Sequence, residues 1–342
     1  MGFKYPKFEK LSNTDKLYDL YICALGFEDR SLGSNNKILK SGIQAKYSII
    51  LQYTTNKKDN EENKSDFERI IGKISNDFCY IKYDFSKRNQ FGERLVNILH
   101  KKHISGNSAI INITSFTTHA LLWILNYLLD NFNEIKIVYT SPKRYNLQSE
   151  NDRSFAAGVK DIFTIPEFIG ANLPGYMTLL VILLGYDLIR ARGVMTQIQP
   201  SKKIGIIPKP TTPNMNNEFQ KNNAAHSISF SHNDKLIKLT IFDLKSLIKS
   251  LIDVRLDHVE NYNILLALNG SKLHAVAALL FAKKFHDIQL ILSTPLEYFP
   301  KSYSEGTGDT YTITITKDWL IRFLHEKSHI FTQRLDPIDK QN

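Results

Sequence analysis

Residues 108–122 read SAIINITSFTTHALL, and this stretch contains the transition on which the fold depends. It starts with a short apolar run typical of a buried strand, and from residue 117 onwards leucine recurs at the spacing of an apolar helix face. Small polar residues fill the turn between the two, as is common where a helix begins. The stretch therefore predicts a buried strand that ends in a polar elbow and leads directly into a helix.

The same pattern occurs a second time, where residues 266–274 read LALNGSKLH. After its helix, each elbow is followed by an apolar strand, IKIVYT at 135–140 and IQLILS at 288–293. When the chain is shifted against itself by roughly 150–160 residues, five blocks align in the same order. The last of them aligns GVKDIFTI at 158–165 with GTGDTYTI at 306–313. Five collinear matches indicate an internal duplication.

Outward from the elbows, apolar strands alternate with helical patterns, and such alternation is typical of a parallel sheet covered by helices on both faces. We therefore expect an α/β fold made of two tandem Rossmann-like units with mainly parallel sheets, internally duplicated. The first unit is expected to span residues 1–168 and the second residues 175–317, followed by a C-terminal helix and tail at 318–342. The polar stretch 210–235 is expected to form a loop or short helix within the second unit.

The composition is that of a folded protein, with 342 residues, 42% hydrophobic and 23% charged. Lys and Arg number 44 against 34 Asp and Glu, a net charge of +10 that favours an anionic partner such as a nucleotide, a nucleic acid or an acidic protein. A lysine-rich composition without functional meaning is the alternative. Two cysteines predict neither a disulfide framework nor a cysteine-based metal site. The polar start and an apolar run at 177–186 that is too short to span a bilayer predict a cytoplasmic protein without membrane contact.

The candidate ligand site follows from where the polar clusters lie. In open parallel sheets, ligands bind beyond the carboxyl ends of the strands, and helix N-termini there favour phosphate groups. The predicted ligand-binding residues are Arg30, Ser86, Thr114, Ser115, Thr117, Arg144, Tyr145, Asn269, Ser271 and Lys272. The alternative for the Ser, Thr and Asn side chains is ordinary helix capping. If both elbows serve one site, the strand ends of the two units must converge around a pseudo-two-fold axis.

A family resemblance rests on the same elbows. The run from Asn112 to Thr117 is similar to the Asp/Asn-hydrophobic-Thr-Gly-Gly-Thr-Lys turn of the CRISPR-associated Rossmann fold (CARF) family, and Asn269-Gly270-Ser271-Lys272 resembles the end of that turn. The resemblance implies a Rossmann-like fold, a cyclic oligonucleotide ligand bound across a two-fold, and a role in bacterial antiphage defence. The related SAVED domains resemble two such units fused in one chain. The first elbow lacks the glycine pair and the lysine of that turn, and the second lacks its leading threonine.

An enzymatic interpretation uses the acidic residues at the strand ends. Glu28, Asp29 and Asp84 could serve a hydrolase or nuclease as general acids and bases, or could activate water at a divalent metal. The alternative is a structural carboxylate–arginine pair, since Glu28 precedes Arg30 and an acid with a following arginine recurs in the second unit. The ten histidines show no metal-binding spacing, so no metal site is predicted, and the sequence names no cofactor. Whether the protein is an enzyme stays open.

A further hypothesis is a protein-interaction subunit of a defence complex, with residues 210–235 as the contact segment. The sequence thus leaves three functions open: a sensor or accessory subunit that binds a nucleotide-type anion between its halves, a hydrolase or nuclease, and an interaction subunit.

Overall fold

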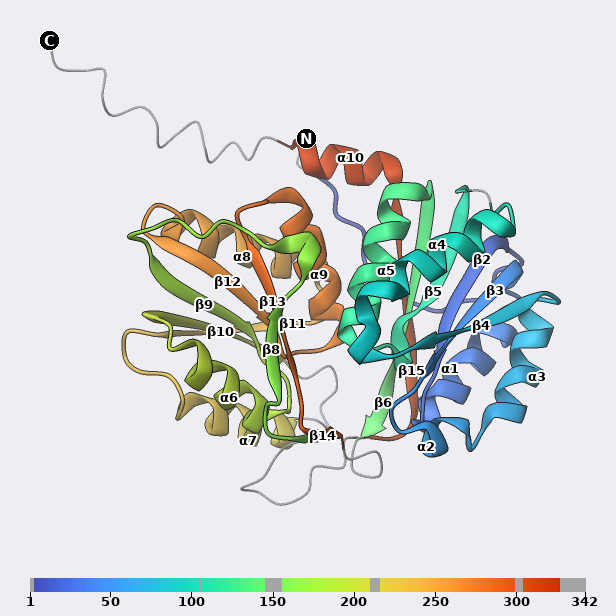
Figure 1. The fold of residues 1–342 in the computed structure, drawn as a ribbon, viewed down its shortest axis with the longest axis horizontal. Coiled ribbons are helices and arrows are strands. Elements are labelled where there is room, and N and C mark those ends of the chain that lie inside the picture. Colours follow the sequence, from blue (N-terminus) through green and yellow to red (C-terminus); the bar gives the residue numbers. More distant parts are fainter. Residues whose placement is uncertain (1–2, 105, 145–155, 210–215, 299–303, 327–342) are drawn as a thin grey trace, which may run out of the picture.

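A computed structural model describes residues 3–104, 106–144, 156–209, 216–298 and 304–326. Within them the chain forms an α/β fold with two mostly parallel sheets, one in each half of the molecule (Figure 1). The expectation of an α/β protein with mainly parallel sheets is confirmed. No helix in these residues is both long and apolar enough to cross a membrane.

The first sheet has seven strands. In spatial order they are β1 (Glu9–Lys10), β15 (Glu305–Thr316), β6 (Glu134–Arg144), β5 (Ser108–Asn112), β2 (Leu17–Leu25), β3 (Gln44–Tyr53) and β4 (Phe78–Tyr83). Strands β6, β5, β2, β3 and β4 run parallel, whereas β15 is antiparallel to β6 and to β1.

The second sheet has six strands. In spatial order they are β11 (Lys235–Thr240), β10 (Lys202–Lys209), β9 (Met177–Leu183), β12 (Tyr262–Leu268), β13 (Gln289–Thr294) and β8 (Asp161–Thr164). The first five are parallel, and β8 is antiparallel to β13. When the parallel strands of each half are numbered along the chain, both sheets have the order 3-2-1-4-5. An internal duplication would produce this repetition.

The last strand of each half lies in the sheet of the other half. Strand β8 follows the parallel strands of the first sheet along the chain but pairs with β13 of the second. Strand β15 follows the parallel strands of the second sheet but pairs with β6 of the first over most of its length. Strands β8 and β15 lie in the two segments, 158–165 and 306–313, that align with each other in the shifted sequence. Continuous chain segments and sheets therefore do not coincide, and each half carries one strand of the other's sheet.

Helices cover both faces of both sheets. The first half contains α1 (Asp29–Lys40), α2 (Lys57–Glu61), α3 (Lys64–Ile74), α4 (Phe91–Lys101) and α5 (Thr118–Asn131). The second contains α6 (Leu188–Ile198), α7 (Asn216–Ser227), α8 (Leu244–His258), α9 (Lys272–Lys284) and α10 (Lys317–His325). Short 3-10 helices lie at η1 (Phe85–Gln90), η2 (Ile113–Ser115) and η3 (Pro166–Phe168), and β7 (Ala156–Ala157) pairs with β14 (Glu297–Tyr298).

The two halves share a hydrophobic core, and each half has a second, separate core cluster. Helices α5 and α9 pack against each other between the sheets (Figure 1), and one continuous cluster of buried side chains runs from α4 and α5 to α8 and α9. At the end of this contact, Lys283 Nζ lies 2.7 Å from Asn126 Oδ1 and 2.8 Å from Asp130 Oδ1. Because α5 and α9 start at the two polar elbows, their packing brings both elbows to the same region.

Candidate functional site

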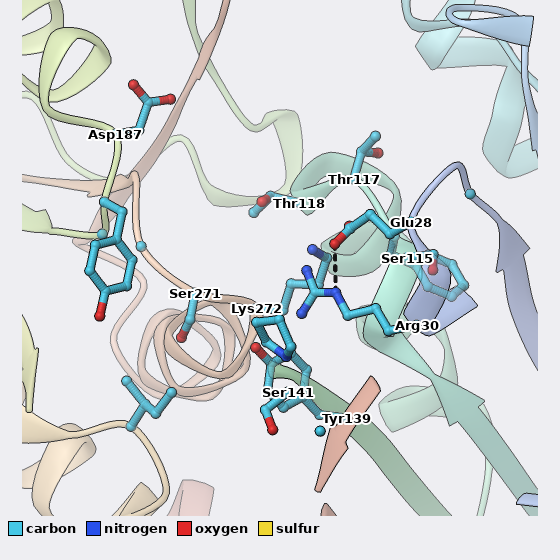
Figure 2. A pocket seen from close by; sticks show the side chains of 18 of the residues that line it. Glu28, Arg30, Ser115, Thr117, Thr118, Tyr139, Ser141, Asp187, Ser271 and Lys272 are labelled. Carbon is cyan, nitrogen blue, oxygen red and sulfur yellow. Dashed lines mark hydrogen bonds and ion pairs between the residues drawn. The ribbon is translucent and has the colours of Figure 1, made fainter. Parts of the chain in front are cut away.

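A cavity of about 690 Å³ lies between the halves, beyond the carboxyl ends of the parallel strands of both sheets (Figure 2). The turns after β2 and β5 supply its wall in the first half, and the turns after β9 and β12 supply it in the second. Its volume is within the range of pockets that hold small ligands. Both elbows thus open into one cavity.

Six of the ten predicted ligand-binding residues line this cavity, together with Glu28. They are Arg30, Ser115, Thr117, Asn269, Ser271 and Lys272. Of the other four, Ser86, Thr114 and Arg144 are not in its wall, and Tyr145 lies outside the described residues.

Thr114 is part of a buried polar network, which explains its absence from the cavity wall. Its hydroxyl donates to Asn112 Oδ1 at 2.7 Å and accepts from the Thr140 backbone N–H at 3.0 Å. Ser34 Oγ lies 3.2 Å from the same hydroxyl, and the Thr140 hydroxyl lies 2.8 Å from that of Thr310 on β15. The polar side chains at the start of this elbow therefore tie α1, β5, β6 and β15 together.

Ser86 and Arg144 also have local roles. Asp84 caps η1 by accepting from the Ser86 backbone N–H at 2.9 Å and from the Ser86 hydroxyl at 2.7 Å, and these hydrogen bonds lower the pKa of Asp84. Arg144 Nε lies 2.8 Å from Glu305 Oε2 at the exposed start of β15. Asp29 accepts from the Gly306 backbone N–H at 3.2 Å. Of the three carboxylates in the enzymatic interpretation, Glu28 alone lines the cavity.

The first elbow is held by its cap and by one tyrosine. Thr117 caps α5 and accepts from the Ala120 N–H at 3.4 Å. The Tyr53 hydroxyl accepts from the Thr117 backbone N–H at 2.9 Å and donates to the Ser115 carbonyl at 3.2 Å. In the second half, Ser271 caps α9 by accepting from the His274 N–H at 3.2 Å. Both elbows therefore cap their helices, as the alternative to ligand binding predicted, while their side chains also line the cavity.

Each half contributes one carboxylate–arginine pair to the wall, and in both pairs the carboxylate has little exposure. In the first half, Glu28 Oε2 accepts from Arg30 Nε at 2.6 Å and from Ser304 Oγ at 2.5 Å. Burial alone would raise the pKa of Glu28, but the charges of Arg30 and Lys272 lower it below its ordinary value. In the second half, Arg190 Nε lies 3.0 Å from Asp187 Oδ2.

Lys272 is the first residue of α9 and faces the Glu28–Arg30 pair of the other half (Figure 2). Its Nζ makes no hydrogen bond or ion pair within the described part of the chain. Burial lowers the pKa of Lys272 to about 8, and the nearby charges of Arg30 and Arg190 act in the same direction, against that of Glu28. A bound anion would stabilise the charged form of this ammonium.

The cavity wall is basic overall and partly aromatic. Among the described residues of the wall, six are basic, namely Arg30, Lys37, Lys143, Arg190, Lys209 and Lys272, and three are acidic, namely Glu28, Asp187 and Asp309. Phe242 and Tyr311 lie with ring centroids 4.1 Å apart, and Tyr139 lies 6.4 Å from Phe242. Such an aromatic group can stack against a nucleobase.

The prediction missed these aromatic residues because they come from separate elements. Tyr139 belongs to β6, Phe242 follows β11, and Tyr311 lies on β15, which the sequence does not assign to the first sheet. Lys37 on α1 and Lys209 on β10 were also missed, because they too come from separate elements. In the part of the chain that the structure describes, no group of three or more His, Cys, Asp or Glu side chains is placed to hold a metal ion.

Comparison with protein-family models finds no match, and comparison with curated proteins finds none either.

Proposed function

We propose that this protein binds a nucleotide-type anionic ligand in the cavity between its halves, as a sensor or accessory subunit in bacterial antiphage defence. The observation that carries the binding proposal is the shared cavity, whose wall contains both elbows, three more basic than acidic residues, and Lys272 without an ion-pair partner among the described residues. The setting in defence rests on the resemblance of the elbows to the CARF turn.

The wall suits a nucleotide in two ways. Four helices begin at or next to the cavity, namely α1, α5, α6 and α9, and helix N-termini stabilise phosphate groups. The aromatic group of Tyr139, Phe242 and Tyr311 offers apolar area for a base in the same cavity. A hydrolase is supported less well, because the carboxylate of Glu28 is already held by Arg30 and Ser304.

The test is a thermal-unfolding screen of the purified protein with millimolar mono-, di- and cyclic nucleotides, and with uncharged nucleosides for comparison. A ligand present at 100 times its dissociation constant stabilises the folded state by about 2.7 kcal/mol, which raises the melting temperature by several degrees. We expect such a rise for at least one nucleotide and a smaller one for its nucleoside. A panel without any shift would contradict the proposal.

Lys272→Met provides the matched test, since it removes the ammonium while keeping an unbranched side chain. It should reduce the nucleotide-dependent shift without lowering the melting temperature of the free protein. The control is Lys249→Met, which removes a charge from an exposed position on α8 outside the cavity wall. Equal loss of the shift in both variants would indicate a general effect of charge on binding.

A further inference from the structure

Three basic side chains from three helices meet in the cavity. Arg30 is the second residue of α1, Arg190 is the third of α6, and Lys272 is the first of α9. The charges of both arginines lower the pKa of Lys272, so the three side chains form one cluster of cations with members from both halves. Like charges gathered in this way repel one another, and an anion between them would remove that repulsion.

The three cations differ in whether a carboxylate neutralises their charge. Arg30 has the carboxylate of Glu28 at 2.6 Å, and Arg190 has that of Asp187 at 3.0 Å. Lys272 has no such partner within the described residues, and it lies at the positive end of α9. Of these three cations, Lys272 therefore carries the uncompensated charge, which adds to the dipoles of the helices that begin beside it.

An unpaired buried donor lies next to this charge. Asn269 is 2% exposed and lines the cavity, and among the described residues its Nδ2 has no hydrogen-bond partner. Leaving such a donor unpaired is unfavourable, because it has lost its hydrogen bonds to water. Asn269 and Lys272 lie at opposite ends of the same four-residue elbow. The Asn269 Nδ2 atom is itself buried, so its amide would have to turn towards the cavity for an oxygen-rich anion to accept hydrogen bonds from both residues.

We propose that this elbow is the subsite for a doubly charged phosphate, either a terminal phosphomonoester or the diphosphate of a nucleoside 5′-diphosphate, bound by Lys272 and Asn269 with Arg30 at its edge. The inference rests on the proposed function and narrows its ligand. A phosphodiester carries a single charge per phosphate, whereas a terminal phosphate or a diphosphate carries two or more near pH 8. The doubly charged group is the better match for an uncompensated ammonium at a helix N-terminus.

The experiment compares ligands that share a base and differ only in the phosphate. Calorimetric titrations at pH 8 would use the 5′-monophosphate, the 5′-diphosphate and the 3′,5′-cyclic monophosphate of each of the four ribonucleosides, and inorganic pyrophosphate. We expect the diphosphate of the preferred base to bind at least tenfold more tightly than its cyclic monophosphate.

The outcomes separate the two proposals. A cyclic phosphodiester that binds as tightly as the diphosphate, or more tightly, would overturn the subsite while leaving nucleotide binding intact. Pyrophosphate binding without any nucleotide preference would support the subsite and contradict the proposed function. Absence of binding by every compound would overturn both.

A second readout identifies Lys272 as the group in contact with the phosphate. With a pKa of about 8, part of the Lys272 side chains are neutral at pH 8, and a bound dianion would recharge them. Complex formation should then take up a fraction of a proton, measured from the binding enthalpy in two buffers with different ionisation enthalpies. Lys272→Met and Lys272→Gln should remove this uptake and weaken diphosphate binding at least tenfold, and Lys249→Met should do neither. Unchanged proton uptake in folded Lys272 variants would overturn the assignment.

Discussion

His119 and His274 are both buried in the first turn of an apolar helix, one in each half. His119 Nδ1 lies 2.6 Å from the Tyr83 hydroxyl, and His274 has no hydrogen-bond partner on either ring nitrogen among the described residues. Neither side chain lines the cavity. Burial lowers the pKa of both histidines to about 4, and it also lowers the pKa of His226.

These shifts predict how the stability of the protein depends on pH. The unfolded chain takes up protons on its histidines near pH 6.5, whereas the folded chain resists protonation down to about pH 4. Above pH 6.5 these two histidines therefore do not reduce the free energy of unfolding. As the pH falls from 6.5 to 4, each of them reduces it by up to about 3 kcal/mol. Urea denaturation over this range measures the slope.

The substitution His274→Asn should make that slope shallower, because it removes one of the titrating groups. The matched control is His103→Asn at an exposed residue whose φ of 48° suits asparagine. An unchanged slope in His274→Asn would show that His274 does not account for the pH dependence.

At the scale of elements, the site depends on the close approach of two turns in each half. A Cβ added to Gly26, after β2, would lie 2.9 Å from Ser115 Cβ in the first elbow. A Cβ added to Gly185, after β9, would lie 3.0 Å from the Asn269 carbonyl and 3.4 Å from Gly270 Cα in the second. Both glycines are needed because the turn packs directly on the elbow.

We therefore expect Gly26→Ala to displace Ser115, to reduce the free energy of unfolding by about 1–3 kcal/mol, and to weaken ligand binding. The same substitution at Gly72, inside α3 and with no atom within 4 Å of an added Cβ, is the control. Gly72→Ala should stabilise the protein by up to about 1 kcal/mol, since alanine favours the helix. Equal effects of the two substitutions in chemical denaturation would contradict the role of the close contact.

At the scale of the whole molecule, the exchanged strands make each half depend on the other. Strand β15 completes the first sheet, where Ile313 is 1% exposed, and β8 completes the second beside Ile291, which is 3% exposed. The shared core between α5 and α9 adds to this dependence. A cavity between two such halves has a wall that neither half forms alone.

Because β15 lies in the first sheet, a substitution in this strand should destabilise the first sheet, although the strand is near the C-terminus. Ile313→Ala removes buried methyl groups at a cost of about 2–5 kcal/mol, and it should increase amide hydrogen exchange first in β6 of the first sheet. Ile291→Ala on β13, as the control, should increase exchange first in the second sheet. If Ile313→Ala instead loosened β13 before β6, the observed pairing of β15 would be wrong for the protein in solution.

The sequence by itself determined the local transitions of this protein. Apolar runs flanked by Thr117 or Ser271 indicated where strands end and helices begin, because caps and side-chain periodicity act within a few residues. The same local reasoning predicted an α/β fold with mainly parallel sheets. It also placed Ser115 and Lys272 at strand ends, where parallel strands present their ligand sites.

Only the tertiary structure decided which strands share a sheet and which polar groups face the cavity. The alternation of side chains in β15 predicts that Ile313 is buried, but the backbone hydrogen bonds of this strand could be satisfied by either sheet. Thr114 and Ser115 are adjacent and similar in chemistry, yet the turn of η2 directs Thr114 into the buried network and Ser115 to the cavity. Pairing of distant strands and the direction of a side chain in a turn depend on contacts across the whole chain, and local sequence does not contain them.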